Sequence, residues 1–486
     1  MKRLWKATCV VAMTVAVATV ASAQERGETL EELEFRSPGS FADAVAAYIY
    51  GYPLLMIGVT GRIATTVATA GDRLGAAPLN QFGKEPKLPD STFTAVVLPS
   101  TSTLYASSFL NLKDGPVILH IPEMGNRFFI MEMLDAWTNV SPESPGSRQG
   151  SRAGDYALVG PDYTGEQPVG TMRMIRMPTN TMWIIGRIFT NNTDSDNNEI
   201  FNHIYPKLTL TPLKQAKGYV PPANLPVEPM PDVVTPPVNQ VAGMDACAFF
   251  SQMASMMYYN PPIPGQDDQI VKALDKLGLL GGSLDCTKVT NMPTLQLAVA
   301  TARSFLNRAP TPSATTTQWT VSLGVGTYGK HYLLRAEVAL HALGANNPED
   351  AVYGVTFNDG TGKPLDGGKN YKIHFDKTGA QSIPPIDGNG FWSLTIYDAL
   401  GKLVPYTNGM TYNAIGIPFV QKHSACLNSD GSLDLYLQNS PPPAGIPFCN
   451  WLQTPASGAY QAFLRMYWPD PVILNSKWIP PPILKN

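Results

Sequence analysis

The chain has 486 residues, 44% hydrophobic and 15% charged, which excludes a disordered polypeptide and allows two or three globular domains. Its formal net charge is −3 and it has no run of Lys or Arg, so nucleic acid and anionic lipid surfaces are poor candidate partners. The 44 prolines and 41 glycines fit many short strands joined by turns better than a helical protein.

The first 23 residues have the pattern of a signal peptide. Lys2, Arg3 and Lys6 precede an uncharged stretch at 9–20, and the small residues at 21–23 fit a cleavage site. The uncharged stretch is shorter than the ~20 residues that a membrane-spanning helix needs, although a retained N-terminal anchor is the alternative. We therefore predict a periplasmic or secreted protein whose mature chain has no membrane span.

The segment 40–215 is predicted to form an N-terminal β-sandwich domain with a leading helix. Ser40 fits an N-cap before a long apolar run, in which Gly51 and Pro53 should kink or interrupt the helix. From 92 to 210, short apolar runs about ten residues apart are separated by Gly, Pro, Asn or Asp. That spacing is typical of a sandwich or a barrel.

The most informative strand of this domain is 128–134. Phe128, Ile130 and Leu134 would point to one side, and Phe129 and Met131 to the other, so both faces are apolar. A strand that is apolar on both faces is predicted to lie inside the domain, covered on both sides.

The rest of the chain divides into three segments. Residues 216–239 are rich in proline and predict an extended linker. Residues 240–345 carry apolar side chains at helical spacing and predict a helical bridge, in which Met253, Met256 and Met257 are more typical of core filling than of a ligand groove. Residues 346–486 return to alternating strands and predict a C-terminal β-sandwich domain.

Four cysteines remain after the predicted cleavage site: Cys247, Cys286, Cys426 and Cys449. An even number of cysteines in an exported chain favours disulfides over free thiols. Pairing of sequence neighbours would give Cys247–Cys286 and Cys426–Cys449, but four cysteines allow three connectivities.

Several motifs in order along the chain resemble bacterial proteins with paired domains of unknown function 1254 (N-terminal) and 1214 (C-terminal). The N-terminal motifs include YGYPLLM, TLYASSFLNL, LDAWTN and PTNTMWIIGRIFTN, and the C-terminal ones include YLLRAEVALHALGANNPEDAVY, FWSLTIYD and LRMYWP. The resemblance implies a mainly β protein with a helical bridge (α+β), built from two jelly-roll-like antiparallel β-sandwiches and often exported. It implies no settled activity.

Relatives usually carry Arg-Pro-Asn-x-Asp-Thr-Leu-Tyr where this chain has Leu98-Pro99-Ser100-Thr101-Ser102-Thr103-Leu104-Tyr105. A site built on those polar groups would therefore take a less charged ligand in this chain or be lost.

Acidic residues on the predicted strands are the candidate catalytic groups. Glu132 and Asp135 are three residues apart on one strand and face opposite sides, so each needs a partner from elsewhere, such as Asp398 after a later strand. Two carboxylates ~5–10 Å apart across a sugar ring are the arrangement of a glycosidase. The alternative is that Glu132 pairs with a buried arginine (Arg148, Arg187, Arg335 and Arg465 are available) and that Asp135 caps a turn.

The candidate substrate-binding residues surround these acids. Trp137, Thr138 and Asn139 follow the strand directly. An exposed Trp beside amide and acid groups commonly binds sugar rings, by stacking and hydrogen bonds. A core Trp at a strand end is the alternative. Arg148, at the end of the following turn, and Tyr105 complete the predicted set.

Other recognition patterns are weak. The six histidines show no helical zinc spacing, and GVGTYG at 324–329 precedes a predicted helix outside any alternating βα region, so we expect no metal and no cofactor. A metal held by residues from separate strands, as in cupin-like barrels, is the alternative. The first hypothesis is an exported protein that binds or hydrolyses a small molecule or glycan. The second is a non-catalytic binding or assembly module that could form a homo-oligomer, in which the same polar residues are structural.

Overall fold

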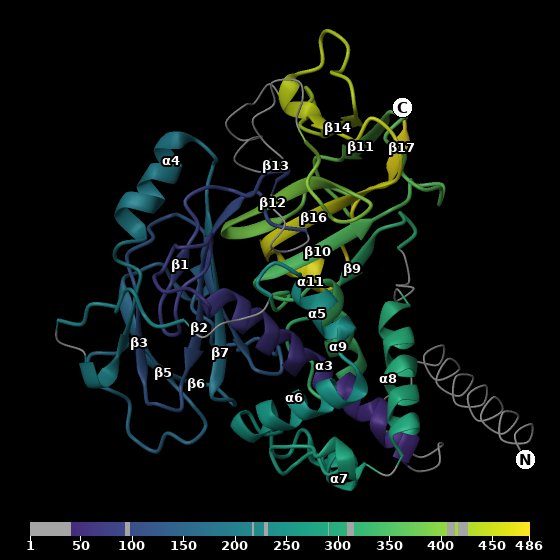
Figure 1. Ribbon diagram of the computed structural model, residues 1–486. Helices are drawn as coiled ribbons and strands as arrows, with labels where there is room; N and C mark the ends of the chain where they lie inside the picture. Colours follow the sequence, from purple (N-terminus) through teal and green to yellow (C-terminus); the bar gives the residue numbers. More distant parts are fainter. Residues whose placement is uncertain are drawn as a thin grey trace, which may run out of the picture.

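The computed structural model contains two β-sandwiches with a group of helices beside and between them (Figure 1). It describes residues 40–92, 98–215, 218–227, 232–289, 291–308, 315–405, 414–416 and 426–486. The predicted signal peptide, residues 1–23, lies outside the described residues, as do 216–217 and 228–231 of the predicted linker.

The N-terminal sandwich consists of two four-stranded sheets. The first has the order β1 (Gly83–Lys84), β2 (Thr103–Asn111), β7 (Thr181–Phe189), β4 (Phe129–Asp135). The second has the order β6 (Arg173–Arg176), β5 (Gly154–Val159), β3 (Val117–Ile121), β8 (Thr209–Pro212). Apolar side chains from both sheets form a common core, which leaves the outer face of the β1-β2-β7-β4 sheet for other contacts.

Strand β4 supplies side chains to both faces of its sheet. Phe129, Met131 and Met133 pack in the sandwich core. Phe128 and Ile130 pack on the opposite side, against the C-terminal sandwich. All of β4 is buried, so the prediction of an interior strand covered on both sides is confirmed.

Among the described residues, the C-terminal sandwich has a five-stranded and a four-stranded sheet. The first has the order β13 (Ala414–Gly416), β12 (Ile386–Asp398), β16 (Tyr460–Pro469), β10 (Ala351–Thr356), β9 (Thr320–Ser322). The second has the order β15 (Trp451–Gln453), β14 (Leu433–Gln438), β11 (Tyr371–Phe375), β17 (Ile483–Lys485). The core between them includes Trp392, Leu394 and Leu435, which the alternation in the sequence places on apolar faces.

The predicted fold class, mainly β with helices and two sandwiches, is confirmed. One detail differs from the prediction of antiparallel sheets. Strand β5 pairs with β6 in parallel, and so does β14 with β15, whereas the other strand pairs are antiparallel.

The central helix is α3 (Ser40–Thr65), against which the other long helices pack (Figure 1). These are α5 (Pro237–Gly243), α6 (Ala246–Tyr259), α7 (Asp268–Lys276), α8 (Met292–Asn307) and α9 (Tyr332–His341). Shorter elements are α4 (Asp194–Glu199), the π-helical turn η2 (Ile200–Ile204), α11 (Pro471–Leu474), and the 3₁₀ turns η1 (Ser147–Gln149), η3 (Leu213–Gln215), η4 (Cys286–Lys288) and η6 (Phe448–Asn450).

Helix α3 runs through both residues that were expected to interrupt it. Pro53 lies inside the helix, and the helix continues to Thr65. Gly51 allows close packing, because a Cβ atom there would lie 2.3 Å from the sulfur of Met253. Met253 and Met257 are buried in the helical core, as the core-filling interpretation of the methionines predicts. Tertiary packing therefore outweighs the local cost of Pro and Gly in this helix.

Residues 41–65 of α3 are long and apolar enough to cross a membrane by length and composition alone. The sequence prediction was an interrupted helix here, and the run was not counted as long enough to span a membrane, although it has no charged residue from 44 to 61. In the structure, 89% of its most apolar window is buried against the rest of the protein. It is placed as the core helix of the helical group.

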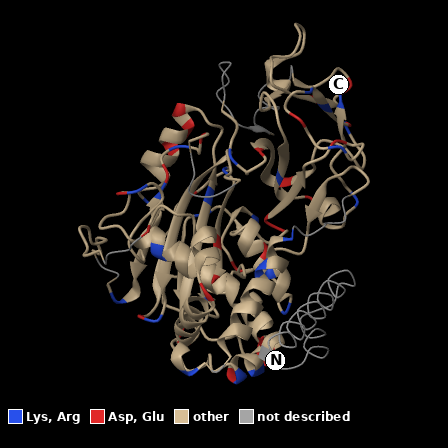
Figure 2. Ribbon diagram, turned by 45° about the vertical axis from the view of Figure 1, so that its right-hand side comes forward, with Lys and Arg blue, Asp and Glu red and all other residues tan. Residues whose placement is uncertain are grey.

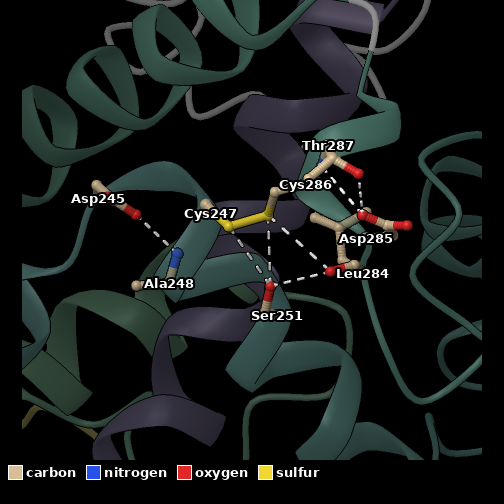
Figure 3. The surroundings of a disulfide bond; sticks show 8 residues. All are labelled: Asp245, Cys247, Ala248, Ser251, Leu284, Asp285, Cys286 and Thr287. Carbon is tan, nitrogen blue, oxygen red and sulfur yellow. Dashed lines mark hydrogen bonds between the residues drawn. A yellow bond between two sulfur atoms is a disulfide. The ribbon is translucent and has the colours of Figure 1, made fainter.

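The two disulfides join sequence neighbours, Cys247 to Cys286 and Cys426 to Cys449. The first links α6 to η4, beside the hydroxyl of Ser251, which donates to the Leu284 carbonyl at 3.3 Å (Figure 3). Of the three possible connectivities, the neighbour pairing is the one present.

Candidate functional site

The outer face of the β2-β7-β4 sheet packs against the outer face of the β12-β16-β10 sheet. Aromatic rings join the two faces: the centroid of Phe128 lies 5.4 Å from those of Phe391 and Tyr467, and Phe189 lies 4.4 Å from Phe391. A group of arginines and tyrosines fills the remainder of this interface. We call Tyr105, Arg187, Tyr353, Tyr397, Arg465 and Tyr467 the arginine–tyrosine cluster.

Arg187 is the cluster's cation on β7. Its Nη1 forms an ion pair with Glu132 on β4 and donates to Asn346 Oδ1 at 3.2 Å, and its Nη2 donates to the Gly344 carbonyl at 2.7 Å. The registers of β4 and β7 place Glu132 opposite Ile185, one diagonal step from Arg187. The positive charge of Arg187 is therefore compensated by a carboxylate on the neighbouring strand.

Glu132 is fully buried on the same face. Burial raises its pKa to about 7, with the nearby Asp350 carboxylate adding to the rise and Arg187 opposing it. Its Oε1 has no hydrogen-bond partner among the described residues. The interpretation that Glu132 pairs with a buried arginine is the one that the structure shows, with Arg187 as the partner.

Arg465, on β16, is the cation that faces Arg187 from the other sandwich. Its Nη2 donates to the Leu98 carbonyl at 2.7 Å, and its Nη1 lies 3.4 Å from Thr395 Oγ1. Its guanidinium carbon lies 4.4 Å from the ring centroid of Phe463. Arg465 is 3% exposed and forms no ion pair with a described carboxylate. Its hydrogen-bond acceptors are neutral.

The tyrosines connect the two cations. Tyr105 lies under the guanidinium of Arg187, at 5.8 Å, and its hydroxyl accepts from the Ser100 amide at 3.1 Å. Tyr397 donates to the Pro99 carbonyl at 2.6 Å, and Asn346 Nδ2 donates to the Tyr353 hydroxyl. Burial raises the pKa of Tyr397 to about 12, opposed by Arg465, so its hydroxyl stays protonated and can donate.

The members of the cluster differ in burial. Tyr105, Tyr353 and the neighbouring Phe463 are half-buried, whereas Arg187, Arg465 and Tyr467 are buried. The backbone is strained at Leu98, whose carbonyl accepts from Arg465 and whose φ of 53° lies in the left-handed region. A non-glycine residue held in that region is a feature that functional sites often share.

Arg148 lies near the cluster in a second ion pair. Its Nε and Nη2 donate to the two carboxylate oxygens of Asp350 at 2.8 and 3.2 Å. Burial raises the pKa of Asp350, and Arg148 opposes this rise. The pair joins η1 of the N-terminal sandwich to the start of β10, so Arg148 has a clear structural role whatever else it does.

Four of the predicted residues, Asp135, Trp137, Thr138 and Asn139, form a largely buried turn at the end of β4. Asp135 Oδ1 accepts from the amides of Trp137 and Asn139, both at 2.8 Å, and its Oδ2 accepts from Asn139 Nδ2 at 2.9 Å. Thr138 adopts a φ of 69° in this turn. Burial raises the pKa of Asp135 to about 6, and its hydrogen bonds with Asn139 oppose the rise. Asp135 therefore caps a turn, as the structural alternative predicts.

Trp137 corrects the expectation of an exposed sugar-binding ring. It is fully buried among the helices, with its ring 4.4 Å from that of Tyr50 on α3. The same rings surround the guanidinium of Arg335 on α9, which lies 5.1 Å from Tyr50, 5.4 Å from Trp137 and 5.1 Å from Tyr332. None of the Arg335 nitrogens has a hydrogen-bond partner among the described residues.

The GVGTYG segment at 324–329 packs on this turn and leads into α9. The Val140 amide donates to the Gly326 carbonyl at 2.8 Å, and Thr327 Oγ1 donates to the Val140 carbonyl at 3.0 Å. Gly326 has a φ of 93°, and a Cβ atom there would lie 2.3 Å from Asn347 Oδ1. Glycine is thus needed for tight packing, consistent with a loop that precedes a helix.

The three candidate carboxylates do not meet. Asp398 lies at the end of β12, where its Oδ1 accepts from the amides of Leu400 and Lys402 at 2.8 and 2.9 Å and caps an exposed turn. Glu132 lies between the sandwiches and Asp135 among the helices. Of the predicted site residues, the structure brings Tyr105, Glu132 and Arg148 to the interface between the sandwiches, and Trp137, Thr138 and Asn139 to the Asp135 turn.

Sequence reasoning named Arg187, Arg335 and Arg465 only as ion-pair partners and missed Tyr353, Tyr397 and Tyr467. The available signal was the presence of Arg465 and Tyr467 on one face of an otherwise apolar strand. Outside the cluster, the basic residues (Lys and Arg) and the acidic residues (Asp and Glu) are scattered over the described part of the chain (Figure 2). No group of three or more His, Cys, Asp or Glu in the described ranges is arranged to hold a metal ion.

Comparison with known proteins supports the family likeness. Residues 79–212 match the model "Protein of unknown function (DUF1254)" and residues 350–471 match "Protein of unknown function (DUF1214)". No curated protein matches the chain. Among solved structures, the VPA0106 protein of Vibrio parahaemolyticus is 19% identical with a TM-score of 0.65, over 92% of this chain and 100% of that one.

A putative uncharacterized protein of Burkholderia cenocepacia is 12% identical with a TM-score of 0.43, over 99% of this chain and 95% of that one. The Vibrio likeness shows a shared fold and carries no activity with it. The two family models match in the order that the sequence motifs indicated, and both matched segments lie within the sandwiches. The chain belongs to the proteins in which a DUF1254 domain precedes a DUF1214 domain.

Proposed function

We propose that the protein is exported and binds an acidic glycan at the arginine–tyrosine cluster, without cleaving it. The observation that carries the proposal is the uncompensated cation of the cluster: Arg465 is buried and bonded only to neutral oxygens. A guanidinium forms its strongest contacts with a carboxylate, which it can hold by two parallel hydrogen bonds. A ligand carboxylate would supply the negative charge that the described part of the chain does not place beside Arg465.

The tyrosines support a sugar as the remainder of the ligand. Tyr105 and Tyr353 are half-buried and each carries an apolar ring and a hydroxyl, and the Tyr353 ring lies 5.9 Å from that of Phe463. Such side chains stack on apolar faces and hydrogen-bond to polar groups at the same time, as a pyranose ring requires. Ligand sites also occur preferentially at interfaces between domains. A uronic acid combines the carboxylate and the hydroxylated ring.

The positions of the carboxylates favour binding over hydrolysis. A glycosidase needs two carboxyl groups that flank the scissile bond. The three candidate carboxylates have separate structural roles. Glu132 forms a buried ion pair with Arg187, Asp135 accepts three hydrogen bonds in a buried turn, and Asp398 caps a turn of the other sandwich. The non-catalytic interpretation from the sequence is therefore the one we adopt.

A ligand panel tests this proposal. Thermal unfolding of the purified protein is followed with trigalacturonate, with maltotriose as the neutral match, and with free galacturonate. We expect trigalacturonate to raise the unfolding midpoint more than maltotriose does at the same concentration, because maltotriose lacks the carboxylate. No shift with either acidic probe would contradict the proposal.

A reducing-end assay on the same mixtures tests the absence of cleavage. Unchanged trigalacturonate after prolonged incubation is the expected result, and release of new reducing ends would replace the binding role by a hydrolytic one.

Export is tested separately, by the N-terminus of the protein recovered from the periplasm or medium, which should begin after residue 23. Self-association stays a prediction that a solution mass measurement checks.

A further inference from the structure

A hollow in the surface lies at the opposite end of β2 from the arginine–tyrosine cluster. Tyr105 and Asn111 are six residues apart on this strand, so the two places are separated by roughly 20 Å at ~3.3 Å per residue. The hollow has a volume of about 250 Å³, and its lining includes Asn111, Asp114, Pro116, Val117, Lys214 and Gln215. We call it the Asn111 cavity.

The lining of the Asn111 cavity contains buried apolar residues and also hydrogen-bond donors and acceptors. Pro116 and Val117 are buried, whereas Asp114, Lys214 and Gln215 are exposed. Asn111 Nδ2 donates to Asp114 Oδ2 at 2.8 Å, which orients the carboxylate. The cavity therefore offers a carboxylate, an amide and an ammonium group over a small apolar surface, a combination suited to a ligand with hydroxyl groups on an apolar frame.

An exposed aromatic ring borders this cavity. Tyr259, the last residue of α6, is 37% exposed, and its hydroxyl lies 3.5 Å from Asn111 Nδ2. The Lys113 ammonium lies 4.7 Å from the centre of the Tyr259 ring, so this cation is already engaged with the ring. The neighbouring Tyr258 is 73% exposed but lies toward Gly282, where a Cβ atom would meet its ring at 3.1 Å.

We infer that the Asn111 cavity is a second saccharide site and takes one neutral sugar ring. The ring packs on Pro116 and on the edge of Tyr259, and its hydroxyls donate to Asp114 and accept from Lys214. Asp114 disfavours a uronate at this place, because like charges repel. The inference goes beyond the acidic-glycan site and does not depend on it, since the two places share no side chain and are far enough apart for substitutions to act independently.

Saturation-transfer NMR with cellotriose, maltotriose and tri-N-acetylchitotriose as probes tests the inference. At least one of these neutral trisaccharides should bind with a Kd in the millimolar range. Tyr259→Ala and Asp114→Ala should each weaken that binding about fivefold, because each removes one contact of ordinary strength. Both side chains are exposed, so the variants should fold, which their thermal unfolding checks.

Matched variants distinguish binding in the Asn111 cavity from binding elsewhere on the protein surface. Tyr258→Ala removes the more exposed neighbouring ring that lies away from the cavity and should leave the affinity unchanged. Absence of binding by all three probes at about 10 mM would overturn the inference. Binding that Tyr259→Ala and Asp114→Ala do not alter would overturn it as well. The proposed function is tested separately, by whether trigalacturonate binding depends on Arg465. Failure of the neutral-sugar site can therefore be distinguished from failure of the acidic-glycan site.

Discussion

Arg187 and Arg465 occupy matching places on the facing sheets of the two sandwiches, but their surroundings differ. Both are buried and both lie near Tyr105 and Tyr467. Arg187 has the Glu132 carboxylate, whereas Arg465 has a carbonyl and a hydroxyl. A buried charge is stable only when it is paired or well hydrogen-bonded. The comparison indicates that Arg187 holds the fold together and that Arg465 is available for an anionic ligand.

The same substitution at the two arginines should show the largest contrast. Arg187→Met leaves Glu132 buried without its cation and also removes the bonds to Gly344 and Asn346. We expect it to lower the free energy of unfolding by about 3–5 kcal/mol. Arg465→Met leaves only neutral acceptors unpaired and should cost about 1–2 kcal/mol. Urea unfolding of both variants measures the difference.

A double variant is the control for this contrast. Arg187→Met with Glu132→Gln removes the stranded carboxylate and should recover part of the loss. Equal losses for Arg187→Met and Arg465→Met, or no recovery in the double variant, would remove the distinction between the two arginines.

A second contrast concerns two aspartates that cap turns. Asp135→Asn places an NH₂ group against Asn139 Nδ2 inside the helical core and should cost about 2–3 kcal/mol. Asp398→Asn keeps an oxygen for the amides of Leu400 and Lys402 in an exposed turn and should cost less than about 1 kcal/mol. The urea midpoints of the two variants test this ranking; a larger loss at Asp398 would reverse it.

The pH dependence of stability should report the buried carboxyl groups. Burial raises the pKa of Glu132 from 4.5 to about 7 and that of Asp135 from 3.8 to about 6, so the folded protein holds protons that the unfolded chain releases. The free energy of unfolding should therefore fall as pH rises from about 4.5 to about 7.

Glu132→Gln isolates one of these groups. It removes one titrating carboxyl and should reduce the slope near pH 6 by about 1 kcal/mol per pH unit, measured by urea unfolding at several pH values. Because the native carboxyl is already partly protonated at pH 7, the variant should remain folded there. A slope identical to that of the native protein would mean that Glu132 keeps an ordinary pKa.

The smallest effect is expected at the strained turn residue. Thr138 has a φ of 69°, and its Oγ1 has no hydrogen-bond partner among the described residues. Thr138→Gly should raise the free energy of unfolding by up to about 1 kcal/mol, because glycine adopts this backbone conformation without steric cost. A loss of stability in the unfolding curve would show that the Thr138 side chain contributes packing that outweighs the strain.

The sandwich architecture could be predicted because it depends on local alternation of side chains. Strand 128–134 has apolar residues on both faces in the sequence and is covered on both faces in the structure. The continuity of α3 could not be predicted in this way, because Gly51 is accommodated by Met253, two hundred residues later in the chain.

The candidate site was predicted less well, because its partners come from distant parts of the chain. Glu132 and Arg187 are 55 positions apart, and Arg465 bonds to a carbonyl 367 positions away. The sequence named the right arginines as possible partners but offered no basis for choosing among them. The burial of Trp137 likewise depends on α3 and α9, which no local pattern around Trp137 reveals.

The most direct test of the central claim is calorimetric titration of trigalacturonate into the native protein, Arg465→Met and the exposed control Arg152→Met, which also loses one positive charge. We expect Arg465→Met to raise the Kd at least about tenfold, because a charge-assisted hydrogen bond is lost, and Arg152→Met to leave it unchanged. Equal affinity of Arg465→Met and the native protein would contradict the assignment of Arg465 as the ligand-binding cation.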